Sequence, residues 1–247
     1  MSSNSSPIFV VFNVGAGNND AAETRAVIEN ACAEADRELH VMVLDDPSNI
    51  GELARETVRR AKEAKGIVVA AGGDGTINAV AQVALANNCI FGVLPKGTFN
   101  YFSRTHGIPA DTKEGMQVLL REKAQPVQVG LVNKQLFLVN ASIGLYPKLL
   151  EDREAWKQQL GRSRLVAASS ALATLLRGFG NLHLRIEVQG KNQAVRTPTL
   201  FVCNNALQMQ QLGFTESSAI DAGQLAGVTL RPLGRLAMIW LMLRGAL

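Results

Sequence analysis

The sequence lacks the features of a secreted or membrane-spanning protein. Its polar N-terminus, MSSNSSP, has no apolar core of a signal peptide, and no apolar run reaches the length needed to cross a bilayer. The three cysteines, Cys32, Cys89 and Cys203, lie far apart without the spacing of a metal site, so we expect reduced thiols. Together these absences predict a cytoplasmic protein.

Two well-known nucleotide-binding motifs are also absent. The chain has no G-x-x-x-x-G-K-[ST] loop and no G-x-G-x-x-G after its first apolar run. Aromatic residues make up only 5% of the chain, which suits close packing of helices on a sheet. The formal net charge of +4 is mild and does not predict a nucleic-acid partner.

The first half of the chain alternates short apolar runs with helical patterns. Such alternation predicts βαβ units and a mainly parallel sheet, and the nearly continuous apolar runs indicate strands covered by helices on both faces. We expect strands at residues 8–12, 40–44, 67–71 and 90–94, and helices at residues 20–38, 50–64 and 76–87.

The pattern changes near residue 124 to runs typical of antiparallel strands. A hairpin is expected around Asn133-Lys134, followed by a long helical stretch over residues 147–179. Further strands are expected within residues 183–188, 197–205 and 224–232. The sequence thus predicts an α/β protein with a parallel sheet and flanking helices in residues 1–124. A second, mainly antiparallel β-rich domain is expected in residues 125–247.

The stretch GGDGT, residues 72–76, joins the expected strand 67–71 directly to a helix. Glycines let a polyphosphate approach the backbone and allow positive φ, and free N–H groups collect at a helix N-terminus. Asp74 can help to hold Mg²⁺ on the phosphates or take a proton from an incoming hydroxyl. Thr76 can cap the helix. The alternative is a glycine-rich turn in which Asp74 is only a turn residue.

Two further loops follow strand ends at the same expected sheet edge. In PKGTFNYFSR, residues 95–104, Gly97 and Thr98 offer main-chain donors and a hydroxyl, and Asn100 can bond across to GGDGT. The same stretch brings two cations, Lys96 and Arg104, toward the expected phosphates. The third loop is NVGAG, residues 13–17. Because the carboxyl ends of parallel strands share one edge, the three loops can converge on one crevice.

Five stretches together resemble the diacylglycerol kinase catalytic domain family, in matching order from about residue 8 to 231. They are VFNVGAG, VVAAGGDGTINAVA, FGVLPKGTFNYFSRTHGIP, LVNASIGLYP and DAGQLAGVTL. The resemblance implies phosphoryl transfer from ATP to a lipid hydroxyl, diacylglycerol- or sphingoid-like, with Mg²⁺. It makes residues 1–124 the nucleotide-binding domain and residues 125–247 a lipid-substrate domain with a long helical insertion.

The resemblance and the loops together give the candidate site. Asp74 is the candidate catalytic residue and the contact to the nucleotide's Mg²⁺. The candidate nucleotide contacts are Asn13, Gly17, Gly72, Gly73, Asp74, Gly75, Thr76, Asn78, Gly97, Thr98 and Asn100.

The chain departs from the family pattern in three places. Tyr101 stands where the family commonly has Asp in Gly-Thr-x-Asn-Asp, and Asp221-Ala222-Gly223 replaces Asp-Asp-Gly, leaving Asp221 as a metal candidate without its neighbouring carboxylate. The chain also ends before the family's final strand pair, whose acid is the proposed base. We therefore expect the β-rich domain to be incomplete and the chain itself to have little activity.

Two rival functions and two partners complete the expectations. An NAD kinase-like enzyme would need an Asn-Glu pair downstream of GGDGT, and none occurs; a catalytically inactive nucleotide-binding fragment is the other alternative. The basic stretch 148–185 indicates either a solvated helix face or peripheral attachment to an anionic membrane. An uncovered sheet edge and apolar helix at the chain end would favour a homo-oligomer.

Overall fold

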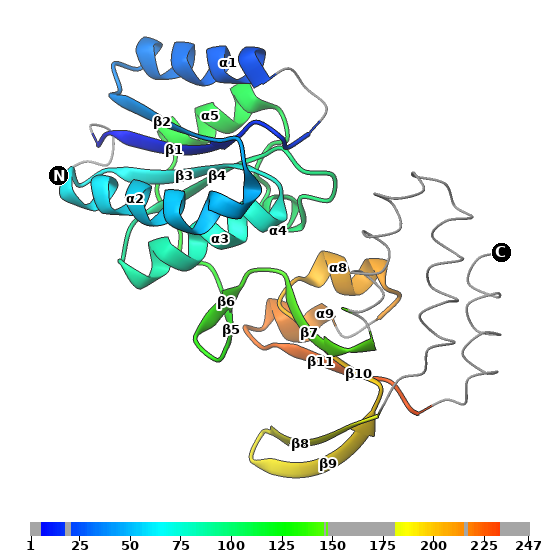
Figure 1. Ribbon diagram of the computed structural model, residues 1–247. Coiled ribbons are helices and arrows are strands. Elements are labelled where there is room, and N and C mark those ends of the chain that lie inside the picture. Colours follow the sequence, from blue (N-terminus) through cyan, green and yellow to red (C-terminus); the bar gives the residue numbers. More distant parts are fainter. Residues whose placement is uncertain (1–5, 18–20, 146, 148–180, 215–216, 233–247) are drawn as a thin grey trace, which may run out of the picture. The chain divides into compact units, whose positions relative to one another are not determined.

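The computed structural model describes residues 6–17, 21–145, 147, 181–214 and 217–232 (Figure 1). These residues form two compact units: the first lies within residues 1–139 and 204–224, and the second within residues 140–203 and 225–247. A compact unit need not be an independently folding domain, so the domain boundary near residue 124 remains a prediction. No helix within the described ranges is long and apolar enough to cross a membrane.

The first unit is built on a four-stranded parallel sheet of order β2-β1-β3-β4. Its strands are β1 (Ile8–Asn13), β2 (Leu39–Leu44), β3 (Ile67–Gly72) and β4 (Phe91–Pro95). The predicted parallel sheet is therefore confirmed, with strand bounds within one residue of those expected.

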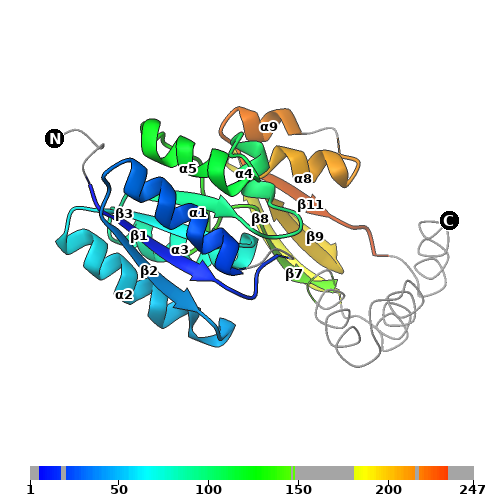
Figure 2. The same ribbon diagram turned by 90° about the horizontal axis from the view of Figure 1, so that it is seen from above.

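Helices cover both faces of this sheet. Two pack on one face, α1 (Ala21–Glu34) and α5 (Thr112–Arg121); two pack on the other, α2 (Ile50–Glu63) and α3 (Asp74–Ala86) (Figures 1 and 2). Side chains of the central strands alternate between the layers: Phe9 and Val11 pack toward α2 and α3, and Val10 and Phe12 toward α1 and α5. Burial on both faces explains why β1 and β3 read as continuous apolar runs.

Several short helices were not predicted from the sequence. The 3₁₀ helix η2 (Pro47–Asn49) precedes α2, and helix α4 (Tyr101–Thr105) follows β4. The helices α8 (Ala206–Gln211) and α9 (Ser217–Asp221) belong to the returning segment, residues 204–224, with which the chain comes back to the first unit. These helices and α5 were missed because glycine, proline and polar residues in and around them obscure the helical spacing.

The expected hairpin around Asn133-Lys134 is present and belongs to the first unit. It joins β5 (Gly130–Val132) to β6 (Gln135–Phe137), and both turn residues have positive φ, 47° and 68°. Positive φ at both positions is the geometry of a type I′ turn, whose twist matches the strands.

The second unit is antiparallel in its described strands, as the sequence predicts. A three-stranded sheet has the order β11-β10-β7, from β7 (Asn140–Gly144), β10 (Thr199–Cys203) and β11 (Ala226–Thr229). A separate hairpin pairs β8 (Leu182–Val188) with β9 (Lys191–Thr197). The expected helical stretch 147–179 lies, apart from residue 147, outside the described residues.

A buried amide holds the returning segment in the first unit. Asn204 is 8% exposed, and its Nδ2 donates to the main-chain oxygens of Gln128 and Leu138, both at 3.0 Å. Its Oδ1 accepts from the Gln128 side chain at 2.6 Å. One side chain therefore donates hydrogen bonds to two main-chain carbonyl groups, those of Gln128 and Leu138.

We predict that Asn204→Ala lowers the free energy of unfolding by about 2 kcal/mol, because it leaves these carbonyls without their donor. Urea denaturation measures the change. Asn192→Ala, at an exposed position of β9, is the matched control and should change stability by less than about 0.5 kcal/mol. Equal effects of the two variants would contradict the role of Asn204.

Candidate active site

The strand order singles out one point of the sheet where ligands bind in other proteins with open parallel sheets. The chain passes from β1 to β2 on one side and then to β3 on the other, so the order reverses between β1 and β3. In open parallel sheets, ligands bind at such a switch point, outside the carboxyl ends of the strands. The loops that follow β1 and β3 flank this point.

The loop after β1 contacts both of the other loops. The Asn13 side chain donates from Nδ2 to Thr76 Oγ1 at 2.9 Å, while its Oδ1 accepts the Gly15 N–H at 3.0 Å. At Gly17, φ is +84° and an added Cβ would lie 2.7 Å from the Lys96 carbonyl oxygen. The predicted convergence of the three loops is therefore present within the first unit.

Close contacts, with a neighbouring main chain in one case and a side chain in the other, explain two of the other glycines. A Cβ on Gly97 would lie 2.7 Å from Gly73 Cα, so the loops after β3 and β4 touch through their main chains. A Cβ on Gly72 would lie 2.7 Å from the Thr76 Cβ. None of the three glycines of GGDGT has positive φ, so that expectation was wrong.

Gly75 differs from its neighbours because no close contact requires a glycine there. It is exposed in the first turn of α3, and no atom of the described residues lies within 4 Å of an added Cβ. A missing side chain here leaves the main chain of the helix N-terminus open to solvent. That is the surface that a phosphate group needs.

Asp74, the first residue of α3, joins the loop after β3 to α4. Burial raises the pKa of its carboxyl group, and the main-chain N–H groups of Asn100, Tyr101 and Phe102 act in the opposite direction, more weakly. One oxygen, Oδ1, is buried and has no hydrogen-bond partner among the described residues. A half-buried carboxylate with one oxygen free can bind a cation or accept a proton.

The Asn100 side chain stabilises its own loop. It bonds the N–H and the carbonyl oxygen of Gly97, both at 2.9 Å, and its φ of +49° lies in the left-handed region that asparagine tolerates. The expectation that this side chain bonds across to GGDGT was wrong. The main-chain N–H groups that begin with Asn100 make that connection to Asp74 instead.

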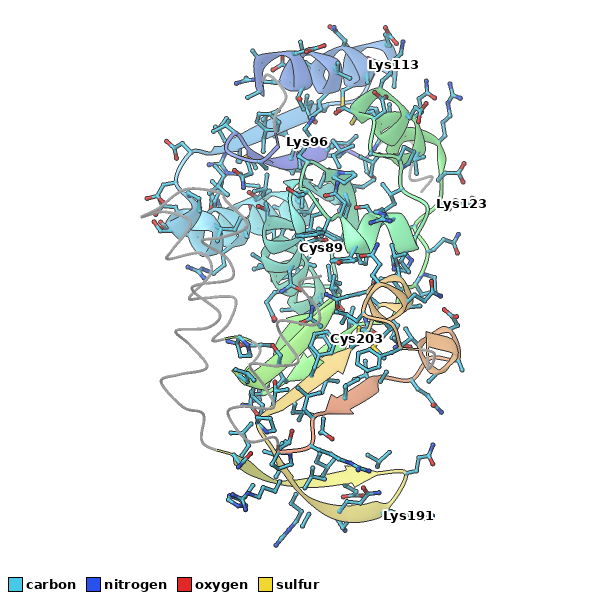
Figure 3. All side chains as sticks on the ribbon, turned by 90° about the vertical axis from the view of Figure 1, so that its right-hand side faces the viewer. Cys89, Lys96, Lys113, Lys123, Lys191 and Cys203 are labelled. Carbon is cyan, nitrogen blue, oxygen red and sulfur yellow. The ribbon has the colours of Figure 1, made fainter. Side chains whose placement is uncertain are left out.

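The two cations near this loop are held by the protein. Lys96 Nζ donates to the hydroxyls of Thr24 in α1, at 3.0 Å, and Thr112 in α5, at 3.4 Å (Figure 3). The Arg104 guanidinium donates to the Phe99 carbonyl oxygen at 3.5 Å. Lys96 therefore points toward the helix layer, and the expectation that it faces phosphates is not supported.

Two other predicted residues have structural partners. Helix α3 begins at Asp74 with Gly73 as its N-cap, so Thr76 is no cap; it lies inside the helix and accepts the bond from Asn13. The Asn78 amide donates to the Leu136 oxygen at 3.1 Å and accepts the Leu138 N–H at 3.0 Å. Asn78 thus fastens the strand β6 to α3, and we do not retain it among the nucleotide contacts.

The remaining candidates lie in exposed positions. Thr98 is exposed in the turn before α4, and Asp221 is exposed at the end of α9. Within the described ranges there is no cluster of three or more His, Cys, Asp or Glu side chains that could hold a metal. A separate metal site at Asp221 therefore finds no support here.

An aromatic pair beside Gly97 was not predicted as part of the site. The rings of Phe99 and Tyr101 stack with centroids 5.5 Å apart, and Phe99 is 55% exposed. The Tyr101 hydroxyl donates to Gln211 Oε1 at 2.9 Å, which ties α4 to α8. Nothing in the sequence indicates that Tyr101 bonds to Gln211. The only signal for the aromatic pair was the alternation of aromatic residues in FNYF.

Comparisons with known proteins identify the family of this chain. Residues 7–132, about half of the chain, match the family model described as "Diacylglycerol kinase catalytic domain". The chain is 34% identical over 151 residues to "Diacylglycerol kinase" of Bacillus subtilis, covering 56% of this chain and 47% of that protein. It is 35% identical over 181 residues to the Pseudomonas aeruginosa protein named "Probable lipid kinase YegS-like", covering 71% and 55%. The chain thus spans about half the length of the curated relatives it matches.

A solved structure shares the fold. A diacylglycerol kinase structure from Bacillus anthracis superposes with a TM-score of 0.59 at 23% identity, covering 81% of this chain and 65% of that one. This likeness, together with the sheets described above, confirms the predicted fold class.

We predict opposite stability effects of alanine at two glycines of the site. Gly75→Ala should raise the free energy of unfolding by about 0.5 to 1 kcal/mol, because it enters open space and improves helix propensity. Gly97→Ala should lower it by at least about 1 kcal/mol, because its Cβ meets the Gly73 backbone. Thermal and urea unfolding measure both; a stable Gly97→Ala variant would contradict the close contact.

A second prediction concerns the pH dependence of stability. Because the native pKa of Asp74 is raised, the native state binds more protons than the unfolded state between the ordinary and the raised pKa. The contribution of Asp74 to stability therefore falls as pH rises through that interval. Relative to wild type, Asp74→Asn should gain stability from acidic to neutral pH. Urea unfolding at a series of pH values tests this, and a trend of opposite sign would refute it.

Proposed function

Because the chain belongs to the diacylglycerol kinase catalytic domain family, we propose that it transfers the γ-phosphoryl group of ATP to a hydroxyl group of a lipid. One observation carries the proposal. Three loops meet at the switch point of a parallel sheet, beside a buried carboxylate oxygen that has no hydrogen-bond partner in the described part of the chain. That arrangement offers main-chain donors for phosphates and one acidic group for the chemistry.

The phosphates of ATP bind at the start of α3 in this proposal. The first N–H groups of a helix have no partner within the helix, and the helix dipole favours negative charge at its N-terminus. Thr98 supplies a hydroxyl from the neighbouring loop. Asn13 and Gly17 act mainly by holding the three loops together, because Asn13 contacts Thr76 and Gly17 contacts Lys96.

Asp74 is the proposed catalytic residue. Its free Oδ1 fits a position in the coordination shell of a nucleotide-bound Mg²⁺, which prefers oxygen ligands. When bound, Mg²⁺ would neutralise charge on the transferring phosphoryl group. A carboxylate with a raised pKa can alternatively accept the proton of the lipid hydroxyl as its oxygen bonds to phosphorus and the bond to the departing ADP breaks.

The lipid is a diacylglycerol- or sphingoid-like alcohol, and the enzyme meets it at a membrane. The proposed attachment is peripheral, through the basic stretch 148–185 and an anionic surface. Most of that stretch lies outside the described residues. The NAD kinase-like alternative is not favoured, since relatives of this chain carry the names of lipid and diacylglycerol kinases.

The test combines nucleotide binding with transfer of labelled phosphate from ATP to a lipid extract. Asp74→Asn should lower transfer by about a hundredfold or more and abolish the benefit of Mg²⁺ for ATP affinity, while Mg²⁺-free binding survives. Gly75→Ala should weaken ATP binding about tenfold, which corresponds to about 1.4 kcal/mol, although it stabilises the fold.

The matched control is Gly227→Ala, at a glycine of β11 that also has open space around it and no positive φ. It should leave ATP binding unchanged. The proposal fails if Asp74→Asn keeps normal Mg²⁺-dependent affinity and transfer. It also fails if Gly75→Ala and Gly227→Ala behave alike.

A further inference from the structure

A large cavity in the first unit lies outside the loops described above. Its volume is about 790 Å³, within the usual range for ligand pockets. It lies beside β4, the edge strand of the parallel sheet, and is bounded by residues of α3, α4, α5 and the segment 122–129. The proposed phosphoryl transfer makes no use of it.

The wall of the cavity is mostly apolar. Leu119, Phe102 and Leu138 contribute to its interior, and three large apolar side chains at its lining are strongly exposed: Leu85, Ile90 and Val127, at 48%, 45% and 42%. Exposed apolar side chains gathered around a hollow mark a binding surface for an apolar ligand. The polar side chains of the lining are a minority: Cys89, His106, Glu122, Lys123 and Gln125.

The free edge of β4 offers main-chain hydrogen-bond donors. Gly92 and Leu94 of β4 bond to β3, so the main-chain groups of Phe91 and Val93 point to the free edge. Neither has a main-chain partner there among the described residues, although Val93 is only 2% exposed. Their N–H groups can donate to an acid.

The charged side chains in the lining are Glu122 and Lys123. Neither forms an ion pair within the described ranges. Lys123 lies toward the periphery of the first unit in the view of Figure 3, on the same unit as Cys89, which also lines the cavity. Lys123 is the cation available to a carboxylate at the mouth of the cavity.

From this cavity we infer that the chain binds a single-chain anionic lipid, a long-chain fatty acid, with its acyl chain along the apolar wall and its carboxylate near Lys123. An extended peptide fits less well, because the outward positions of β4 end at Pro95, which has no N–H. Only two main-chain donors would remain for strand pairing. This inference does not rest on the proposed kinase activity.

Cys89 provides the readout. It lines the cavity and is partly exposed, whereas Cys32 and Cys203 are 1% and 0% exposed. The experiment measures the rate of maleimide labelling of Cys89 by peptide mass spectrometry while decanoate, dodecanoate, tetradecanoate or hexadecanoate is titrated below its micelle concentration. No nucleotide is needed, so failure here is distinguishable from failure of the proposed kinase function.

We predict saturable protection of Cys89 with an affinity that rises about fourfold for each added CH₂ group until the cavity is filled. Absence of protection overturns the inference. So does protection that does not depend on chain length, which indicates detergent-like adsorption. Protection by an alternating Val-Thr peptide but not by the fatty acids would also overturn it, and would assign the edge to a strand.

Two lysine variants test the orientation of the ligand, and a third variant tests the length of the cavity. Lys123→Gln should weaken hexadecanoate binding about threefold to fivefold and leave hexadecanol binding unchanged, because only the acid uses the ammonium group. Lys113→Gln, an exposed lysine of α5 away from this cavity, is the matched control and should change neither. Ala81→Leu, which enlarges a residue of the wall, should shorten the preferred chain; its folding is checked by urea unfolding. Equal effects of the two lysine variants overturn the placement of the carboxylate.

Discussion

The contact between the Asp74 carboxylate and the main-chain N–H groups at the start of α4 organises the candidate site. It joins the loop after β3 to the loop after β4, which also touch through Gly73 and Gly97. Burial makes this contact expensive for the charged carboxylate, and the N–H groups offset only part of that cost. The close packing of Gly73 on Gly97 and the hydrogen bonds of Asn100 to Gly97 lie in the same two loops. The site is therefore one assembly of main-chain contacts around a carboxylate.

Much of the first unit follows from the sequence because its signals are local. Continuous apolar runs such as residues 67–71 require burial on both faces, and alternation with helical patterns leaves few topologies besides a parallel sheet. The convergence of the three loops also follows, since the carboxyl ends of parallel strands lie at one edge. GGDGT could be located from its position between a strand and a helix.

The detailed partners within the site could not be predicted, because they join distant residues. Asn13 bonds to Thr76, and Tyr101 bonds to Gln211, across 63 and 110 positions of sequence. Asn78 illustrates the same limit: as a polar residue after GGDGT it suggested a ligand contact, but its amide holds the main chain of the strand β6. The glycines carried a further ambiguity. Their small size was informative, but only the structure separates Gly97, required by the neighbouring backbone, from Gly75, which has free space around it.

The returning segment 204–224 also constrains how the protein can be made. Asn204 supports the carbonyls of residues 128 and 138, and Asn205 donates to the Tyr101 oxygen at 3.2 Å and to the Thr105 hydroxyl at 2.8 Å. A ribosome that has synthesised residue 139 has made the whole parallel sheet but none of these donors. The first unit therefore has to wait, with α4 and the outgoing segment incompletely bonded, until more than sixty further residues have been added. Contacts of such long sequence separation close slowly, so the order of synthesis leaves the neighbourhood of Asp74 among the last parts of this unit to become native.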